Sequence, residues 1–168
     1  SWIEERTIRT IFFGGGTPSL IGYKRLIWLI SAIRDTFSID DDAEFTIEAN
    51  PESGTYDLFK NLVPFGLNRV SFGAQSFHDD ELEQLGRVHN SKQIRQALQN
   101  ALDAGIENRS IDLIFALPGQ SLQRWEENVN KAIACRTEHI SAYGLSYEEG
   151  TLLHRLYKNG RVTPTEDE

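Results

Sequence analysis

Residues 10–20 read TIFFGGGTPSL. In this stretch an apolar, strand-like run leads into three glycines, which are followed by Thr17, Pro18 and Ser19. β-Branched and aromatic residues predict a strand over 9–15. Glycine adopts positive φ and lets the backbone approach a ligand closely. The glycines therefore either form a tight turn without a ligand or bind an anion at the start of a helix. The run matches neither the phosphate loop GxxxxGK[ST] nor the dinucleotide motif GxGxxG.

The same order of strand, turn and helix recurs along the chain. Further strands are predicted at 44–50, 68–75, 111–119 and 139–146. Helices are predicted, mainly from apolar residues at helical spacing, over 23–37, 56–63, 79–85, 91–104 and 121–134. Strands of near-continuous apolar character are typical of a parallel sheet that is buried on both faces. The sequence therefore predicts an α/β fold with a parallel sheet, either open or barrel-like.

Several residues within these elements have expected structural roles. Ser91 is expected to cap the start of the 91–104 helix, and Gly105 is expected to end it in the left-handed conformation. Trp28 and Trp125 belong to apolar stripes that are expected to face the core. Cys135 follows such a stripe, so we expect a buried helix residue rather than a nucleophile.

The composition argues against several classes of protein. Hydrophobic residues make up 39% of the 168 residues, enough for the core of one domain. The net charge of −8 and the lack of a basic run argue against a nucleic-acid partner. No apolar run approaches the ~20 residues of a transmembrane segment. The single cysteine favours a cytoplasmic protein. Because the chain contains no methionine, we expect residues 1–168 to be a piece of a longer protein.

Polar residues gather where the predicted strands end. Ligands bind at the carboxyl ends of parallel strands, so these residues predict a binding face. They are Gly15, Gly16 and Thr17 after the first strand, Glu48 in the second, Gln75 in the third, Asp112 in the fourth and Ser146 in the last.

Each of these side chains also has a plain structural interpretation. A carboxylate within a strand, such as Asp112, is costly unless it is paired or meets a ligand, so it either binds a ligand or forms a buried ion pair. Glu48 either contacts a ligand or caps a loop, and Gln75 is either a ligand group or a turn residue. Arg87 suits recognition of a carboxylate, although a solvated surface arginine is the simpler interpretation. His89 is expected to be structural.

Five blocks of sequence, taken together and in order, resemble a known family. They are GGGTPSL, EANP, GLNRVSFGAQSFHDDELEQLGRVH, IDLIFALPGQ and HISAYGLSYEEGT. The blocks resemble the radical S-adenosylmethionine (SAM) proteins of the oxygen-independent coproporphyrinogen III oxidase type, and most closely their heme chaperone branch. The resemblance implies a partial parallel (β/α)6 radical SAM barrel. It also implies that this chain supplies strands two to six of a single core domain, with the first strand and the cluster loop missing.

The resemblance also assigns roles at the methionyl end of SAM. Gly15, Gly16 and Thr17 match the turn that lies along the methionyl group. Glu48 matches an acidic residue suited to the ammonium group. Arg87 matches the arginine that would pair with the methionyl carboxylate.

Three further residues match positions at the nucleoside end of SAM. Gln75 and Asp112 match positions near the ribose hydroxyls, where both side chains can accept hydrogen bonds. Ser146 matches a backbone contact near the adenine.

The family binds a [4Fe-4S] cluster through a CxxxCxxC motif, which would lie upstream of Ser1. One cysteine cannot ligate such a cluster, so we assign no residue of this chain as a metal ligand. Without the cluster we expect the isolated chain to bind SAM weakly or undetectably and not to cleave it. The family's C-terminal region, which is linked to heme binding, is expected to be missing as well.

The resemblance leaves the function between two members of one family. The first is a heme chaperone, which binds heme and transfers it to a heme-acceptor protein. The alternative is an oxygen-independent coproporphyrinogen III oxidase, whose substrate is a porphyrinogen that it decarboxylates oxidatively to protoporphyrinogen IX. Whether the protein is an enzyme is therefore left open. A third possibility, of another class, is a phosphate-binding α/β enzyme that uses the glycine turn as an anion cradle.

Overall fold

A computed structural model of the chain describes residues 7–160 and residue 162. Strands and helices alternate along these residues. The strands are β1 (Ile8–Phe13), β2 (Ile39–Ala49), β3 (Arg69–Gln75), β4 (Asn108–Phe115) and β5 (His139–Gly144). The helices are α1 (Tyr23–Thr36), α2 (Tyr56–Leu62), α3 (Asp79–Gln84), α4 (Ser91–Asp103), α5 (Leu122–Ala134) and α6 (Leu152–Lys158), with two short 3-10 helices, η1 (Pro18–Ile21) and η2 (Val63–Phe65).

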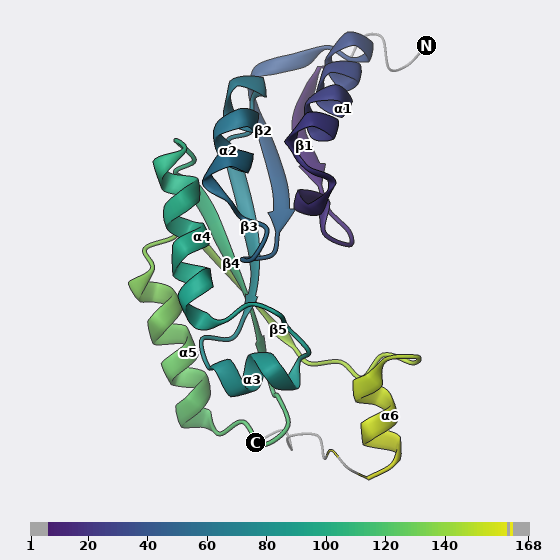
Figure 1. Cartoon of the computed structure of the whole chain (residues 1–168), viewed down its shortest axis with the longest axis vertical. Coiled ribbons are helices and arrows are strands. Elements are labelled where there is room, and N and C mark those ends of the chain that lie inside the picture. Colours follow the sequence, from purple (N-terminus) through teal and green to yellow (C-terminus); the bar gives the residue numbers. More distant parts are fainter. Residues whose placement is uncertain (1–6, 161, 163–168) are drawn as a thin grey trace.

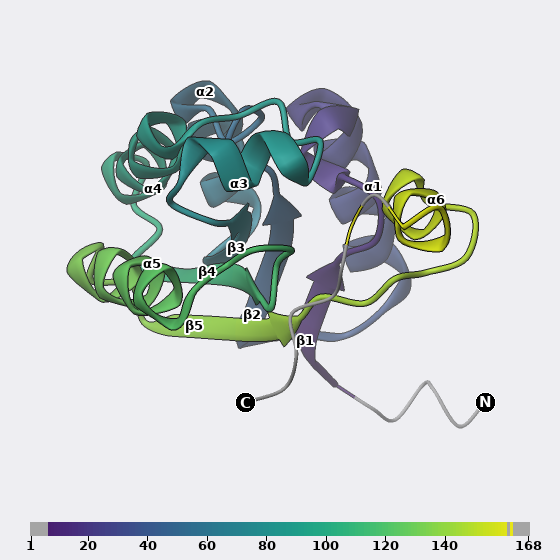
Figure 2. The same cartoon turned by 90° about the horizontal axis from the view of Figure 1, so that it is seen from below.

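The strands form one parallel sheet in the order β1-β2-β3-β4-β5, so each strand pairs with the next one along the chain. Figure 1 shows α1, α2, α4 and α5 along one side of this sheet. Figure 2 shows the sheet from below, curled, with these helices on its outer side. A parallel sheet that curls with its helices outside has the architecture of a partial (β/α) barrel. The expected fold class is therefore confirmed.

The hydrophobic core lies between the outer face of the sheet and the helices. Strand residues such as Phe45, Val70 and Phe72 enter it from one side, and helix residues such as Leu26 and Phe59 enter it from the other. The Phe59 and Phe72 rings meet edge to face with centroids 5.9 Å apart. This core fixes the direction of every strand, and therefore the place where each strand ends.

The inner face of the sheet is polar, because side chains alternate between the two faces of a strand. Val70 and Phe72 point into the core, so Ser71 between them lies on the inner face, where its register partner on β2 is Glu48. The central strands β2, β3 and β4 are largely buried on both faces beyond Glu44, as expected. That expectation is wrong for β1 and β5, much of which is exposed.

Several elements begin or end away from their predicted positions. Strand β2 begins at Ile39 rather than 44, because Ile39 pairs with Ile8 of β1, a contact that the acidic residues 40–42 do not signal. Strand β4 covers Asn108–Phe115 rather than 111–119. Asn90, not Ser91, caps α4, and its side chain accepts hydrogen bonds from the backbone of Lys92 and Gln93.

Other expectations concern residues outside the sheet. Gly105 has a φ of +96° after α4, as expected of a left-handed helix end. Helix α6 was not predicted; Thr151 caps it by accepting a hydrogen bond from the backbone of His154. Trp125 packs against the core, whereas Trp28 is 73% exposed, so its expected burial is wrong. In the described part of the chain, no helix is long and apolar enough to cross a membrane.

Candidate functional site

A cavity of about 480 Å³ opens at the carboxyl ends of the strands and holds most of the residues that the sequence singled out. Its walls come from the glycine turn after β1, from β2, β3 and β4, from the loop after α3 and from the end of β5. Of the eight predicted site residues, seven line it: Gly16, Thr17, Glu48, Gln75, Arg87, Asp112 and Ser146. Gly15 is not part of the lining, but its backbone N–H is hydrogen-bonded to Glu48, which is.

The glycine turn is connected to the carboxylate of β2. Gly15 donates its backbone N–H to Oε2 of Glu48 at 2.9 Å. Gly15 and Gly16 have φ values of +83° and +59°, and a Cβ at either position would meet no atom within 4 Å. The backbone conformation, rather than crowding, is therefore what requires glycine at these two positions. Glu48 both caps the turn, as its structural interpretation held, and lines the cavity.

A second contact connects the same turn to the end of β2. The Asn50 amide nitrogen donates to Oγ1 of Thr17 at 3.2 Å, and both residues line the cavity. The backbone carbonyl of Asn50 accepts from the N–H groups of Ser53 and Gly54, which folds the following segment into a turn. Asn50 is the last residue of the predicted strand 44–50, and nothing in the local pattern pointed to its partner Thr17.

Gln75 ends β3 in the left-handed region, with a φ of +66°. The register between β3 and β4 shifts between Phe72 and Gln75, which marks an irregularity at the end of the strand. The Gln75 amide also lies over Gly73, since a Cβ on that glycine would be 2.9 Å from its Nε2. The bare backbone of Gly73 therefore leaves room for the Gln75 side chain beside the cavity.

Asp112 lies on the inner face of β4 and is bonded to hydroxyl groups rather than to a cation. Ser71 Oγ lies 3.1 Å from each of its carboxylate oxygens. Burial raises the pKa of Asp112 and the nearby Glu48 charge adds to this, while hydrogen bonds from Ser141 and Ser71 and the charge of Arg69 oppose it. A desolvated carboxylate of this kind can accept further hydrogen bonds from a ligand. Ser71 and Ser141 were missed, and only the strand register brings them beside Asp112.

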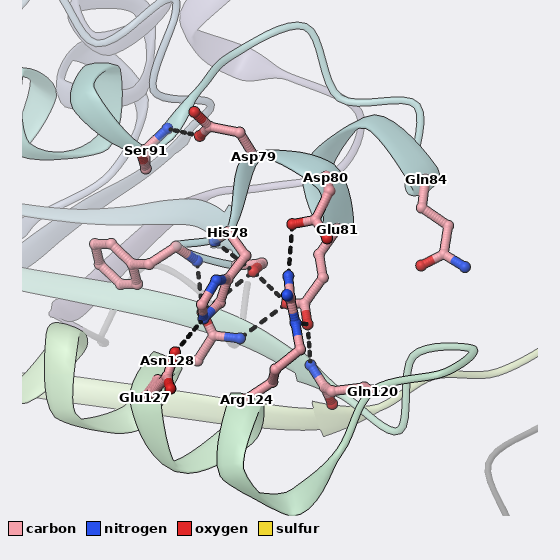
Figure 3. A network of polar contacts seen from close by, with 12 residues as sticks. His78, Asp79, Asp80, Glu81, Gln84, Ser91, Gln120, Arg124, Glu127 and Asn128 are labelled. Carbon is pink, nitrogen blue, oxygen red and sulfur yellow. Dashed lines mark hydrogen bonds and ion pairs between the residues drawn. The ribbon is translucent and has the colours of Figure 1, made fainter.

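Arg87 reaches the cavity from the loop that follows α3, and a buried polar network holds α3 in place (Figure 3). The centre of the network is Glu81, whose residue exposure is only 4%. Its Oε1 accepts from Arg124 and Gln120 of the α5 side at 3.0 and 3.2 Å, and its Oε2 accepts from Ser76 and Asn128. Burial on its own would raise the pKa of Glu81, but these hydrogen bonds outweigh it and lower that pKa.

Asn128 completes the network, because its Oδ1 accepts the backbone N–H of Phe77 in the turn between β3 and α3. Sequence reasoning missed every member of this network. The acidic run 79–81 is typical of an exposed helix start, and nothing local to it indicates burial. The network thus fixes α3, and with it the start of the loop that contains Arg87.

Two further residues have the places that follow. His89 is buried, with 3% exposure, in keeping with the structural role expected of it. Cys135 was expected to be a buried helix residue, but it is half-buried and lies directly after the last residue of α5. It donates to the backbone carbonyl of Lys131 at 3.3 Å, and burial raises the pKa of its thiol. The single cysteine does not line the cavity.

The cavity offers groups for a ligand with several kinds of functional group. Arg87 can bind an anion, Glu48 can bind a cation, and Asp112 and Gln75 can accept hydrogen bonds from hydroxyl groups. Among residues 7–160 and 162, no group of three or more His, Cys, Asp or Glu side chains could hold a metal ion. The lining therefore offers charged groups of both signs, and the described residues supply no ligand set for a metal cluster.

Comparison with known proteins identifies relatives of both the sequence and the fold. The radical SAM superfamily matches residues 2–132. The heme chaperone HemW of Bacillus subtilis is 40% identical over 156 residues, which are 92% of this chain and 41% of that protein. HemW of Haemophilus influenzae is 37% identical over 150 residues, 89% of this chain and 39% of that protein. The chain thus spans about two fifths of the length of these curated relatives.

Among solved structures, the coproporphyrinogen III oxidase HemN of Escherichia coli superposes with a TM-score of 0.84. The match covers 94% of this chain and 37% of that one at 24% sequence identity. At this identity the likeness shows a shared fold and nothing finer.

Proposed function

The chain belongs to the radical SAM superfamily, and from that premise we propose that the cavity binds S-adenosylmethionine. The observation that carries the proposal is that seven of the residues expected to contact SAM line one cavity, although they come from six separate segments of the chain. A cavity of about 480 Å³ is also of the size at which proteins enclose small ligands.

The chemistry of the lining supports one orientation of the ligand. Arg87 would pair with the methionyl carboxylate, because a guanidinium offers two parallel donors to a carboxylate. Glu48 would bind the ammonium group beside the turn that it already caps. Asp112 and Gln75 would accept hydrogen bonds from the ribose hydroxyls, and Ser146 would contact the adenine through its backbone. Bound hydroxyls would give the desolvated Asp112 carboxylate donors in addition to Ser71.

Membership of the family also implies a [4Fe-4S] cluster, which together with SAM supplies the family's radical chemistry. The described residues contain no ligand set for such a cluster. The role of the described residues is therefore to bind and orient SAM.

We propose further that the whole protein is a heme chaperone, which binds heme and transfers it to a heme-acceptor protein. The support is the identity of 40% and 37% to two proteins named as heme chaperones, over about nine tenths of this chain. The alternative, an oxygen-independent coproporphyrinogen III oxidase acting on a porphyrinogen, would use the same SAM face. Only a likeness of fold at 24% identity favours it, so the chaperone is the better supported.

The SAM site is tested by equilibrium binding to the full-length protein with its cluster rebuilt anaerobically. We expect Arg87→Gln and Asp112→Asn each to weaken SAM binding about ten-fold or more, because each removes a hydrogen bond to a charged group. Arg25→Gln, an exposed arginine on α1, is the matched control and should bind as the unaltered protein does. Unchanged affinity in both site variants would refute the site.

The heme proposal is tested by titrating the same protein with heme and following the Soret band. Saturable binding near one heme per protein supports the chaperone. No specific binding, together with turnover of coproporphyrinogen III, would replace it with the oxidase.

A further inference from the structure

The loop of residues 85–90 brings Arg87 to the cavity, and one buried side chain anchors it. Gly86, Val88 and Asn90 are exposed, and Val88 is 81% exposed. His89 is the exception, since only 3% of it is accessible. A short exposed loop that buries a single polar residue takes its position largely from the contacts of that residue.

The two ring nitrogens of His89 contact two other segments of the chain. Nδ1 lies 3.1 Å from Oε2 of Glu52, in the turn after β2, and Nε2 lies 3.2 Å from the backbone carbonyl of Ala74 in β3. Oε2 of Glu52 and the carbonyl oxygen of Ala74 are both acceptors, so a ring nitrogen that carries a hydrogen donates to the acceptor that it faces. A hydrogen bond to a carboxylate is charge-assisted and stronger than a neutral one. His89 therefore connects the loop of residues 85–90 with the turn after β2 and with strand β3.

Each of these three segments delivers a residue to the cavity. Asn50 lies two positions before Glu52, Gln75 follows Ala74, and Arg87 lies two positions before His89; all three line the cavity. Asn50 is also hydrogen-bonded to Thr17. Gln75 is held by the sheet, because it belongs to β3 and pairs with Leu113. Arg87 lies outside the helices and strands of the described residues, and its backbone N–H donates to the carbonyl oxygen of Leu82 in α3. Of the three, Arg87 depends most on His89.

We propose that His89, with Glu52 as its partner, is a positioning residue that places the Arg87 guanidinium in the cavity. The inference rests on the proposed SAM site, since it concerns the residue that would bind the methionyl carboxylate. His89 itself does not line the cavity, so it acts through Arg87 and not on the ligand.

The test compares two ligands in the full-length protein with its cluster rebuilt. SAM has a methionyl carboxylate, whereas 5′-methylthioadenosine keeps the nucleoside and lacks both the amine and the carboxylate. We expect His89→Gln to weaken SAM binding about ten-fold and to leave 5′-methylthioadenosine binding unchanged, because only the charged hydrogen bond to the carboxylate is lost. Combined with Arg87→Gln, it should weaken SAM binding little further than Arg87→Gln does, because the two residues act as a unit.

Two other variants separate positioning from general damage. Glu52→Gln removes the carboxylate partner and should give the same pattern as His89→Gln, and it decides the question if His89→Gln does not fold. His154→Gln, the same substitution on α6, should change binding of neither ligand.

The outcomes distinguish this inference from the function on which it rests. If the unaltered protein binds neither SAM nor 5′-methylthioadenosine, the proposed site fails and the inference fails with it. If the unaltered protein binds SAM but the variants bind it equally well, or lose both ligands by the same factor, the site stands and the positioning role is overturned. Full additivity with Arg87→Gln would overturn it too.

Discussion

Replacing Glu81 by glutamine tests whether the buried network of Figure 3 holds α3 against the rest of the molecule. The carboxylate accepts four hydrogen bonds through its two oxygens, from Ser76, Gln120, Arg124 and Asn128. A glutamine keeps the shape but replaces one oxygen by an amide that donates. On either side that amide would face a group that only donates, Arg124 or the Asn128 amide nitrogen, so at least one hydrogen bond is lost and the charge opposite Arg124 disappears.

The magnitude follows from these losses. Each hydrogen bond to a charged group contributes about 1.5–3 kcal/mol, and breaking a buried ion pair by removing one partner costs about 3–5 kcal/mol. Glu81→Gln should therefore lower the free energy of unfolding by about 3–5 kcal/mol. The matched control is Asp80→Asn, which breaks the ion pair of the same Arg124 with a carboxylate whose side chain is 70% exposed. A surface pair of this kind contributes about 0–1 kcal/mol.

The assay is urea unfolding followed by circular dichroism, at neutral pH and in steps toward acid. The hydrogen bonds hold the pKa of Glu81 in the folded chain below its value in the unfolded chain. Its contribution is therefore fully present above the unfolded pKa and is lost as the pH falls through the folded one. The difference between the unaltered chain and Glu81→Gln should shrink over that acidic range. A loss no larger than that of Asp80→Asn at neutral pH would refute the argument.

Three further outcomes follow from single residues. Burial raises the pKa of Asp112, so the charge on this carboxylate destabilises the ligand-free fold as the pH rises through that pKa. Asp112→Asn should therefore raise the melting temperature at neutral pH while it weakens SAM binding, and a lower melting temperature would contradict this. Gly16→Ala places a Cβ on a backbone with a φ of +59° and should cost about 1–2 kcal/mol in urea unfolding, whereas no loss would show that the turn relaxes freely. Burial also raises the pKa of the Cys135 thiol, so alkylation at neutral pH should be slower than for free cysteine and should accelerate in urea; equal rates would show an exposed thiol.

Local patterns in the sequence were enough to predict a parallel α/β sheet, while the choice of a barrel over an open sheet came from the family resemblance. The alternation of strands and helices, the parallel sheet and the residues that lie where strands end all follow from side-chain type and spacing over a few positions. Because parallel strands end at one edge, the same reasoning predicted that Glu48, Gln75 and Asp112 would lie together, and they line one cavity. Their contacts with SAM remain a prediction.

What local patterns could not predict is which side chains meet. Glu81 belongs to an acidic run that is typical of an exposed helix start, yet its partners Arg124 and Asn128 are 43 and 47 positions away on α5. His89 likewise depends on Glu52, 37 positions earlier. Residue spacing within a segment indicates whether that segment forms a helix or a strand. These contacts instead depend on the register of the sheet and on the packing of helices against it. The sequence alone therefore determined the parallel α/β fold and the residues that lie where its strands end. Only the tertiary structure decided which buried contacts hold these residues in place.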